Sequence, residues 1–483
     1  MAYTIGKRMQ PLMLPSIIDD YVGPQDPVRV YDAFVDALNF ESLGISLSPQ
    51  GSADEYYPKD MLKLIIYAYS YGHRSSRKIE RACHHNLSFQ WLMGGLMPDY
   101  RSIARFRSKY KEQIKKVLKQ CVSICLDLDL IEGNVLFIDG SKFRANASIN
   151  NTWTKERCEK NLKKIHEQIE QLVEDCERTD EQEEPDSMIN LHQKIENKEQ
   201  LMQKIQKSLQ QLQDDDSKKQ INSTDTDSVN AKGRQGTHAS YNVQSAVDAK
   251  HGLIIQADAI SQSNDYNQLS VQVEKAVENI GKKPEHVCAD AGYADVDDIK
   301  KIDPAINIIV PSHRQAQEAN GRSPIHPFDK THFVYDAQTN QYICPQGNRL
   351  ELDGFIDKNH RKIRYQAKGS ECQSCPDFGD RELGKCTSSL KGRRIIRLTD
   401  EKFKEQLEAN YNRPESQEIY KLRKEKVEHP FGHMKHNLGA GQFMLRGRPK
   451  VNAEVSVLAT CFNIARMITI LGIPQLLARL NST

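Results

Sequence analysis

The stretch Val135-Leu136-Phe137-Ile138-Asp139-Gly140 decides the expected fold. Its four apolar residues are too few for a stable helix, so they predict a short buried strand with a carboxylate at its tip. A later stretch, Val287-Cys288-Ala289-Asp290, has the same form. Two such strands predict a core with an acid at the end of each.

The chain around these two strands alternates between strand and helix signals. Residues 241–247 and 253–257 are apolar runs joined by a turn, which predicts a β-hairpin, whereas the polar residues 224–236 predict a loop. Helical spacing over residues 266–280 precedes the second aspartate strand, and a last strand follows at 306–310. Strand, strand, strand, helix, strand, helix and strand in this order predict an α/β (α+β) fold with a ribonuclease-H-like catalytic core.

Helical patterns flank and interrupt this core. From residue 26 to about residue 130, apolar residues recur at helical spacing, and Tyr57-Pro58-Lys59 opens a helix. After residue 150, apolar positions step by three and four on both sides of Pro185, which predicts an antiparallel helical hairpin. Its apolar stripe is interpreted as a packing seam, with dimerisation or a DNA-facing role as alternatives. We expect a helical amino-terminal module at 1–130, for which DNA binding and a packed helical bundle with no ligand are the two interpretations. The other expected segments are the first core strand with Asp139 (131–150), the inserted coiled-coil-like hairpin (151–220), the core with Asp290 (221–325), a four-cysteine insertion (326–400) and the helical carboxy-terminal part of the core with Glu428 (401–475).

The overall charge gives no sign of a nucleic-acid partner, because 67 Lys and Arg residues stand against 65 Asp and Glu residues, a net charge of +2. A local excess does exist. Eight Lys and Arg residues between Lys421 and Lys450 face only two acids, Glu425 and Glu428. A solvated helix face and a DNA contact are the two interpretations of such a run, and its position around a candidate catalytic acid favours the second.

The amino terminus lacks the apolar core of a signal peptide, and no run is expected to reach the roughly 18 apolar residues of a membrane span. We therefore expect a soluble, cytoplasmic and nucleoid-associated protein with no membrane partner. Eleven cysteines, an odd number, argue against a disulfide framework. Cys344, Cys372, Cys375 and Cys386 are spaced C-x27-C-x2-C-x10-C, which leaves two interpretations open: a structural Zn²⁺ site or four unliganded thiols.

Cutting and joining of phosphodiester bonds requires one oxygen to be activated as a nucleophile and another to be stabilised as it leaves. Two divalent ions about 3.5–4 Å apart can serve both ends of the reaction. Mg²⁺, or Mn²⁺ in its place, prefers carboxylate oxygens. Asp139 and Asp290 supply two such ligands, so a third acid is expected from a helix that packs against the sheet.

The third acid is expected in a helix over residues 420–435. We select Glu428 there, with Glu425 and Glu454 as rivals. Basic residues stand one to two turns on either side of Glu428, where they suit the phosphates that flank a scissile bond. These basic residues are Arg423 and Lys435.

Short motifs follow one another along the chain, and in combination they are specific although each alone is weak. They are Tyr57-Pro58-Lys59, Arg74-Ser75-Ser76-Arg77-Lys78-Ile79-Glu80, Pro98-Asp99, Phe106-Arg107, Phe137-Ile138-Asp139-Gly140-Ser141-Lys142, Ala145-Asn146-Ala147, Ala289-Asp290-Ala291-Gly292-Tyr293, Val427-Glu428-His429-Pro430-Phe431-Gly432 and Leu445-Arg446-Gly447. In this order they resemble the motifs of IS1182-family transposases, within the broader IS4/IS5-like DDE group. The similarity runs over nearly the whole chain, from about residue 10 to residue 470.

The resemblance implies a transposase that cleaves DNA and transfers strands with divalent metal during transposition of an insertion sequence. In it, Asp139, Asp290 and Glu428 are the catalytic and metal-binding triad. Tyr420, Arg423 and Lys435 match the Tyr, Arg and Lys that accompany the glutamate. One departure is that four residues separate Arg423 from Glu428, where the compact signature has three.

DNA is therefore the expected partner, both as terminal inverted repeats of the element and as target, bound by a homodimer. DNA contacts are expected from Arg74, Arg77, Lys142, Tyr420, Arg423, Lys435 and Arg446. Two alternatives remain at this point: a hydrolytic ribonuclease-H-like nuclease that cuts but never joins, and a non-catalytic DNA-binding protein derived from a transposase. A strand-transfer assay separates the first from a transposase, and Mg²⁺-dependent cleavage separates the second.

Overall fold

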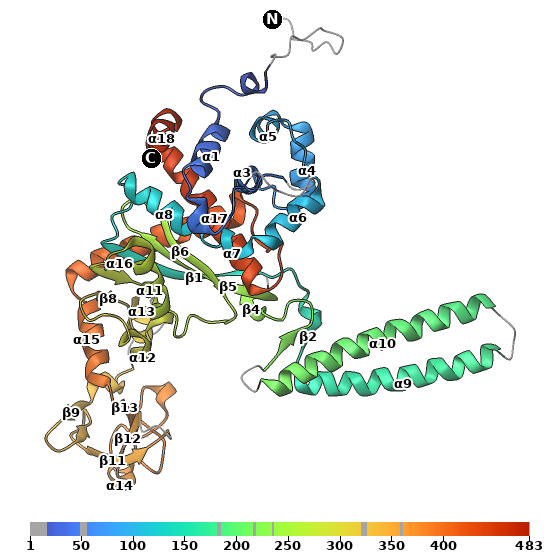
Figure 1. The fold of residues 1–483 in the computed structure, drawn as a ribbon. Coiled ribbons are helices and arrows are strands. Elements are labelled where there is room, and N and C mark those ends of the chain that lie inside the picture. Colours follow the sequence, from blue (N-terminus) through green and yellow to red (C-terminus); the bar gives the residue numbers. More distant parts are fainter. Residues whose placement is uncertain are drawn as a thin grey trace, which may run out of the picture. The chain divides into compact units, whose positions relative to one another are not determined.

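The computed structural model describes residues 17–48, 56–180, 185–215, 219–233, 236–319, 326–357 and 361–482. The chain is a mixed α/β protein (Figure 1). It forms two compact units, which are described separately. Unit 1 comprises Met1–Asp265, Val271–Pro284 and Lys424–Thr483, and unit 2 comprises Tyr266–Ser270 and Glu285–Arg423.

Unit 1 begins with a set of mostly short helices. They are η1 (Ile18–Tyr21), α1 (Pro27–Asp36), α2 (Phe40–Leu43), α3 (Pro58–Ser70), α4 (Ser76–His85), α5 (Leu87–Leu92), α6 (Tyr100–Lys109), α7 (Lys111–Ile114) and α8 (Val117–Asp127). Local chemistry fixes their starts: Asp26 accepts a hydrogen bond from Val28 N (2.9 Å) at the start of α1. Pro58 occupies the first turn of α3 as predicted, because its missing N–H costs nothing there.

Two carboxy-terminal helices, α17 (Arg448–Leu471) and α18 (Ile473–Leu480), complete this helical part. α17 packs against α3, α7 and α8 and against strand β6 (Ile254–Ile260). Among the described residues it is the one helix that is long and apolar enough to cross a membrane by length and composition, with a mean hydropathy of 1.5. The protein itself buries 67% of the most apolar stretch of α17, as is usual for a helix in the core of a folded protein.

The sheet of unit 1 is built on the predicted hairpin. Strand β5 (Gly236–Asp248) pairs antiparallel with β6, and β1 (Val135–Arg144) pairs antiparallel with β5. Asp139 lies opposite Ser245 in the middle of β1, so the prediction that it stands at a strand tip is wrong. The strand continues because buried Phe143 pairs with Tyr241, which extends the apolar side of β1 beyond Gly140.

Part of the polar segment predicted as a loop is also a strand. β4 (Val229–Gly233) pairs antiparallel with the first half of β5. Its sequence, Val-Asn-Ala-Lys-Gly, has only one buried residue, Ala231. A strand that pairs through its backbone alone carries almost no apolar pattern, which is why the sequence did not indicate it.

The predicted helical hairpin is confirmed as α9 (Lys155–Asp180) and α10 (Pro185–Asp214), which run side by side (Figure 1). At its base, β2 (Thr152–Trp153) pairs with β3 (Ile221–Asn222) next to η2 (Ile149–Asn151). The apolar stripe forms a small core of its own, so it is the packing seam that was predicted. The buried members of this core are Trp153, Cys158, Ile165, Ile205, Leu212 and Ile221.

Unit 2 contains a short parallel pair and a separate antiparallel sheet. The parallel pair is β7 (His286–Cys288) with β8 (Asn307–Ile309). The antiparallel sheet has the order β13-β12-β11-β10-β9. Its strands are β9 (Val334–Asp336), β10 (Gln341–Ile343), β11 (Arg349–Phe355), β12 (Lys362–Ala367) and β13 (Arg394–Leu398). The helices of this part are η3 (Ala291–Tyr293), α12 (Val296–Ile299), α13 (His313–Ala319), η4 (Lys330–His332), α14 (Gly369–Gln373), η5 (Arg381–Leu383) and α15 (Glu401–Tyr411).

The division of the chain into two units falls within two helices. α11 (Leu269–Ile280) and α16 (Pro414–Gly432) each begin in unit 2 and end in unit 1. A π-helical turn, η6 (His433–Asn437), follows α16 directly. α16 therefore carries the candidate Glu428 on its unit 1 part.

Candidate active site

The strand face around Asp139 is the first part of the candidate site. Side chains alternate along a strand, so Asp139, Ser141 and Phe143 lie on one face of β1. Asp139 and Ser141 are half-buried, whereas Phe143 is buried. Asp139 is therefore partly accessible to solvent and lies on the same face as the buried Phe143.

The end of α16 and the π-helical turn after it lie against this same face. Lys435 Nζ donates a hydrogen bond to Ser141 Oγ (2.6 Å) and lies 4.6 Å from the centre of the Phe143 ring. The rings of Phe431 and Phe143 are 6.2 Å apart. Glu428 lies three residues before Phe431 on α16 and is exposed, whereas Phe431 is buried. The structure thus brings the helix of Glu428 onto the strand face of Asp139.

The three competing glutamates differ sharply in their surroundings. Glu428 and Glu425 are exposed on α16. The Glu454 side chain is fully buried, and its oxygens accept hydrogen bonds from Met444 N (3.1 Å) and Leu445 N (3.1 Å). Glu454 also pairs with Arg74, so its oxygens are already occupied within the fold. These contacts make Glu454 a structural residue. Glu428 and Glu425 remain as candidates for the third carboxylate of the site.

Asp290 stands in unit 2, two residues after β7. Its side chain caps η3 by accepting a hydrogen bond from Gly292 N (2.8 Å), so its orientation is fixed locally. Tyr420 and Arg423 lie close together on α16, with the guanidinium 5.6 Å from the Tyr420 ring centre. Burial raises the pKa of Tyr420, Arg423 opposes this, and the charge of Asp290 adds to the increase. Asp290, Tyr420 and Arg423 therefore share one electrostatic environment.

Three polar side chains, Asn242, Gln244 and Asp265, lie next to Gly140 and are called the polar bed. The sequence did not predict this cluster. Asp265 Oδ1 accepts hydrogen bonds from Asn242 Nδ2 (2.7 Å) and Gln244 Nε2 (2.7 Å), and both donors come from buried positions of β5. A Cβ added at Gly140 would collide with Asp265 Oδ1 and with Gln244 Nε2. Polar residues at buried positions of a strand are the signal that could have revealed this bed.

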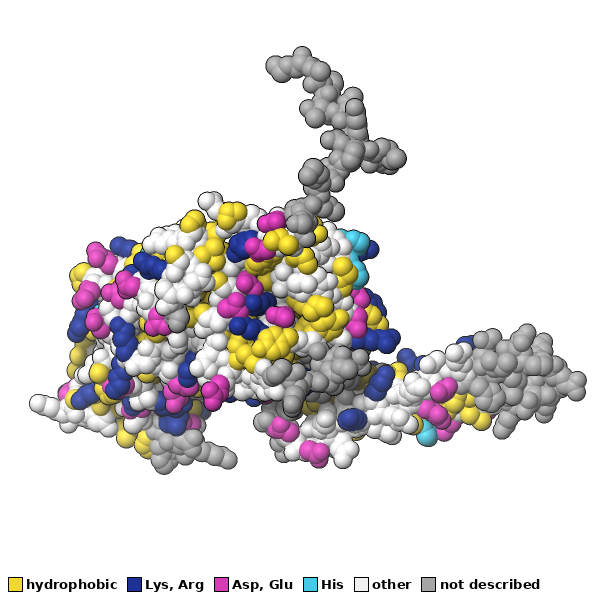
Figure 2. All heavy atoms as spheres, turned by 45° about the horizontal axis from the view of Figure 1, so that its top comes forward, with side chains coloured by type: hydrophobic (Ala, Val, Ile, Leu, Met, Phe, Trp, Pro, Cys, Tyr) yellow, Lys and Arg dark blue, Asp and Glu magenta, His cyan; other side chains and the backbone are white. Residues whose placement is uncertain are grey.

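The residues predicted to contact DNA divide into exposed, half-buried and buried groups. Arg77 and Arg446 are exposed, and Arg77 lies 5.2 Å from the ring centre of Tyr100. Lys142, Tyr420, Arg423 and Lys435 are half-buried. Arg74 is 6% exposed, so the structure does not offer it to DNA and the expectation of a direct contact is corrected. On the face drawn in Figure 2, Lys and Arg side chains are interspersed with Asp and Glu.

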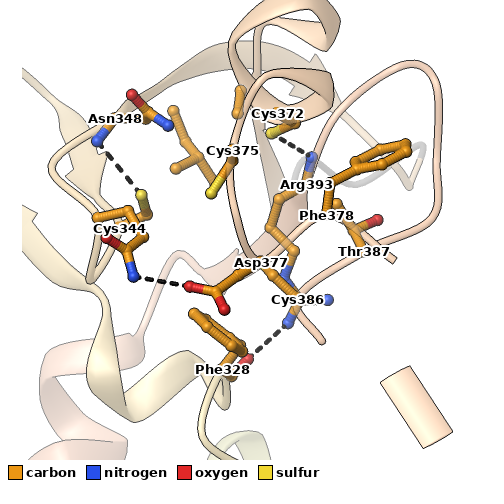
Figure 3. A pocket seen from close by; sticks show the side chains of 13 residues that line it. Phe328, Cys344, Asn348, Cys372, Cys375, Asp377, Phe378, Cys386, Thr387 and Arg393 are labelled. Atoms are coloured by element: carbon orange, nitrogen blue, oxygen red, sulfur yellow. Dashed lines mark hydrogen bonds between the residues drawn. The ribbon is translucent and has the colours of Figure 1, made fainter. Parts of the chain in front are cut away.

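Four cysteines of unit 2 line one pocket. They are Cys344, Cys372, Cys375 and Cys386 (Figure 3). None of the ten described cysteines forms a disulfide. Among the described residues, no group of three or more His, Cys, Asp or Glu side chains is arranged to hold a metal ion. Metal binding by the three acids and by the four cysteines therefore stays a prediction.

Comparisons with known proteins match two segments of the chain. A family described as "Transposase DDE domain" matches residues 343–468, which include Glu428 and the four cysteines of the pocket but neither Asp139 nor Asp290. A family described as "Transposase domain (DUF772)" matches residues 16–109, the first helices of unit 1. No curated protein and no solved structure matches the chain. The chain therefore carries two transposase domains, and these are typical of IS1182-family transposases.

Proposed function

We propose that the protein is a DDE transposase that cleaves DNA at the ends of an insertion sequence and transfers the freed strand to target DNA. The observation that carries the proposal is the packing of the end of α16, through Phe431, and of η6, through Lys435, on the Asp139 face of β1. The helix that bears Glu428 is also inside the segment matched by the DDE domain. A ribonuclease-H-like core is the fold that we infer for this arrangement.

Asp139, Asp290 and Glu428 would hold Mg²⁺ or Mn²⁺ in this proposal. The donor set fits such ions, because all three are carboxylates and none is buried. Bound divalent ions would activate the attacking oxygen and stabilise the leaving oxygen. Lys435, held against Ser141 and Phe143, would orient a DNA phosphate near Asp139. Arg423 would do the same near Asp290, since both lie in the environment of Tyr420.

The test compares two neighbouring glutamates of α16 in a strand-transfer assay with labelled element ends and Mg²⁺. Glu428→Gln should abolish both cleavage and joining, because it removes one charge from the metal-binding set. Glu425→Gln is the matched control, since Glu425 is also exposed on the same helix. Equal activity of both variants would refute the assignment of Glu428.

The same assay separates the two alternative functions. Asp139→Ala should abolish cleavage while DNA binding remains close to that of the unchanged protein. A nuclease would cut the labelled ends without ever joining them. A non-catalytic DNA-binding protein would show no Mg²⁺-dependent cleavage in any variant, and either outcome would overturn the proposal.

The expected DNA partners follow from the same proposal. The protein would bind the terminal inverted repeats and the target as a homodimer, with phosphate contacts from exposed Arg77 and Arg446. Phosphate contacts make binding sensitive to salt. Sedimentation of the protein on a labelled end fragment measures whether one or two copies bind.

A further inference from the structure

The four cysteines of unit 2 come from separate segments of the chain and meet around one small cavity (Figure 3). Cys344 follows β10, Cys372 lies in α14, Cys375 follows that helix, and Cys386 lies between η5 and β13. The cavity has a volume of about 20 Å³, which is room for one occupant of the size of a water molecule. Four thiols at one cavity are the donor set of a structural zinc site.

Backbone N–H groups point at two of the sulfurs. Asn348 N lies 3.2 Å from Cys344 Sγ, and Arg393 N lies 3.4 Å from Cys372 Sγ. Hydrogen bonds from outside a coordination shell orient the metal ligands.

Each of these sulfurs stands on a tight backbone turn. After Cys344, Gly347 N donates to Cys344 O (2.8 Å), and Gly347 adopts a φ of +83°, which a residue with a side chain rarely adopts. At the other turn, Cys375 N donates to Cys372 O (3.1 Å). These turns fix the backbone of the two cysteines at the cavity wall.

The other polar groups at the cavity are engaged elsewhere. Asp377 accepts a hydrogen bond from Gln346 Nε2 (2.7 Å) and lies 3.8 Å from Lys385 Nζ. The guanidinium of Arg393 donates to Phe328 O (3.1 Å). The four sulfurs are therefore the donor set, and the positive charge of Arg393 would offset the negative charge left when four thiolates surround one zinc ion.

The core beside the cavity is small. Its buried residues are Phe328, Phe333, Tyr342, Leu350, Tyr365, Ala367, Cys372 and Ile395. The other side of the sheet exposes apolar side chains, including Val334 (65% exposed) and Ile396 (45%). Small modules with so little apolar core commonly depend on a metal or on disulfides for stability, and no disulfide is present among the described cysteines.

We propose that Cys344, Cys372, Cys375 and Cys386 bind one structural Zn²⁺ ion that holds the antiparallel sheet of unit 2 together. The side chains would turn toward the cavity centre on binding, since the thiols as they stand do not form a ligating group. Four protein ligands leave no open position, so this zinc takes no part in catalysis. The proposal does not depend on the proposed transposase activity.

The test measures metal in the full chain, purified without chelator. Elemental analysis should find about one zinc per chain, and Cys375→Ser with Cys386→Ser should lose it. Cys83→Ala is the matched control, because Cys83 is a buried thiol of α4 in unit 1. Zinc retained by the double variant would overturn the proposal.

A second measurement removes the risk that the double variant fails to fold. The unchanged chain, stripped of metal and given Co²⁺, should develop the visible and charge-transfer absorption of a tetrahedral thiolate site. Chelation should also increase proteolytic cleavage within unit 2 while the helices of unit 1 stay intact. Absence of the Co²⁺ spectrum would overturn the proposal, whereas Asp139→Ala should show it unchanged whether or not the transposase assignment is correct.

Discussion

Arg74 and Glu454 form a buried ion pair that joins the turn before α4 to helix α17. Arg74 Nη1 and Glu454 Oε1 are 3.3 Å apart, and their side chains are 6% and 0% exposed. Arg74 also donates to Gln442 O, and Arg107 donates to Arg74 O (2.8 Å). The network fixes the first helices of unit 1 to the helix that follows the candidate catalytic segment.

Loss of this pair should destabilise unit 1. Glu454→Gln leaves the Arg74 charge buried without its partner, so we expect a loss of about 3–5 kcal/mol in the free energy of unfolding, measured by urea titration. The exposed pair of Lys119 and Glu278 is the control, because its partners are 48% and 69% exposed. Glu278→Gln should change stability by less than about 1 kcal/mol. A similar small loss in both variants would contradict the structural role of Glu454.

Gly140 should tolerate no side chain. A methyl group there would collide with the Asp265 and Gln244 side chains, so Gly140→Ala should cost about 1–3 kcal/mol and lower strand transfer by shifting β1 beside Asp139. Gly23 has open space around its Cβ position and no positive φ. Gly23→Ala should therefore leave both stability and strand transfer unchanged. Full strand transfer by Gly140→Ala would show that the polar bed does not position Asp139.

His433 should make stability depend on pH. Burial, followed by the charge of His429, lowers the pKa of His433 below 6.5, and its ring packs 5.4 Å from that of Phe462. Because the pKa is lowered in the folded state, the contribution of neutral His433 to the free energy of unfolding is complete above pH 6.5. It is lost as the pH falls through the folded pKa. Urea titrations at a series of pH values should therefore show stability falling on acidification, and His433→Gln should flatten that slope. An unchanged slope in the variant would assign the effect to other groups.

Arg77 and Arg74 should behave differently toward DNA although they are three residues apart. Arg77 is exposed, so Arg77→Ala should weaken DNA binding. It should also reduce the slope of log affinity against log salt concentration by about 1, the value for one lost phosphate contact. Arg74→Ala should instead lower the stability of unit 1, because Arg74 is held by Glu454. Fluorescence anisotropy over a salt series measures the first effect, and urea titration the second. An unchanged salt slope for Arg77→Ala would contradict a phosphate contact at that position.

The sequence by itself determined the features that depend on neighbours along the chain. Steps of three and four predicted α9 and α10, and apolar runs predicted β5, β6, β7 and β8, because periodicity reflects which side of one element is buried. The segment with Glu428 and the four cysteine positions were also visible from local spacing. Their arrangement in space was not.

Tertiary structure decided whatever depends on partners distant in the chain. Arg74 and Glu454 are polar residues that sequence reasoning placed at the surface or near metal, yet they neutralise one another inside unit 1. Asp139 lies mid-strand because β5 continues to pair beyond Gly140. The choice of pairing partner is set by packing over the whole unit, so no window of sequence contains it.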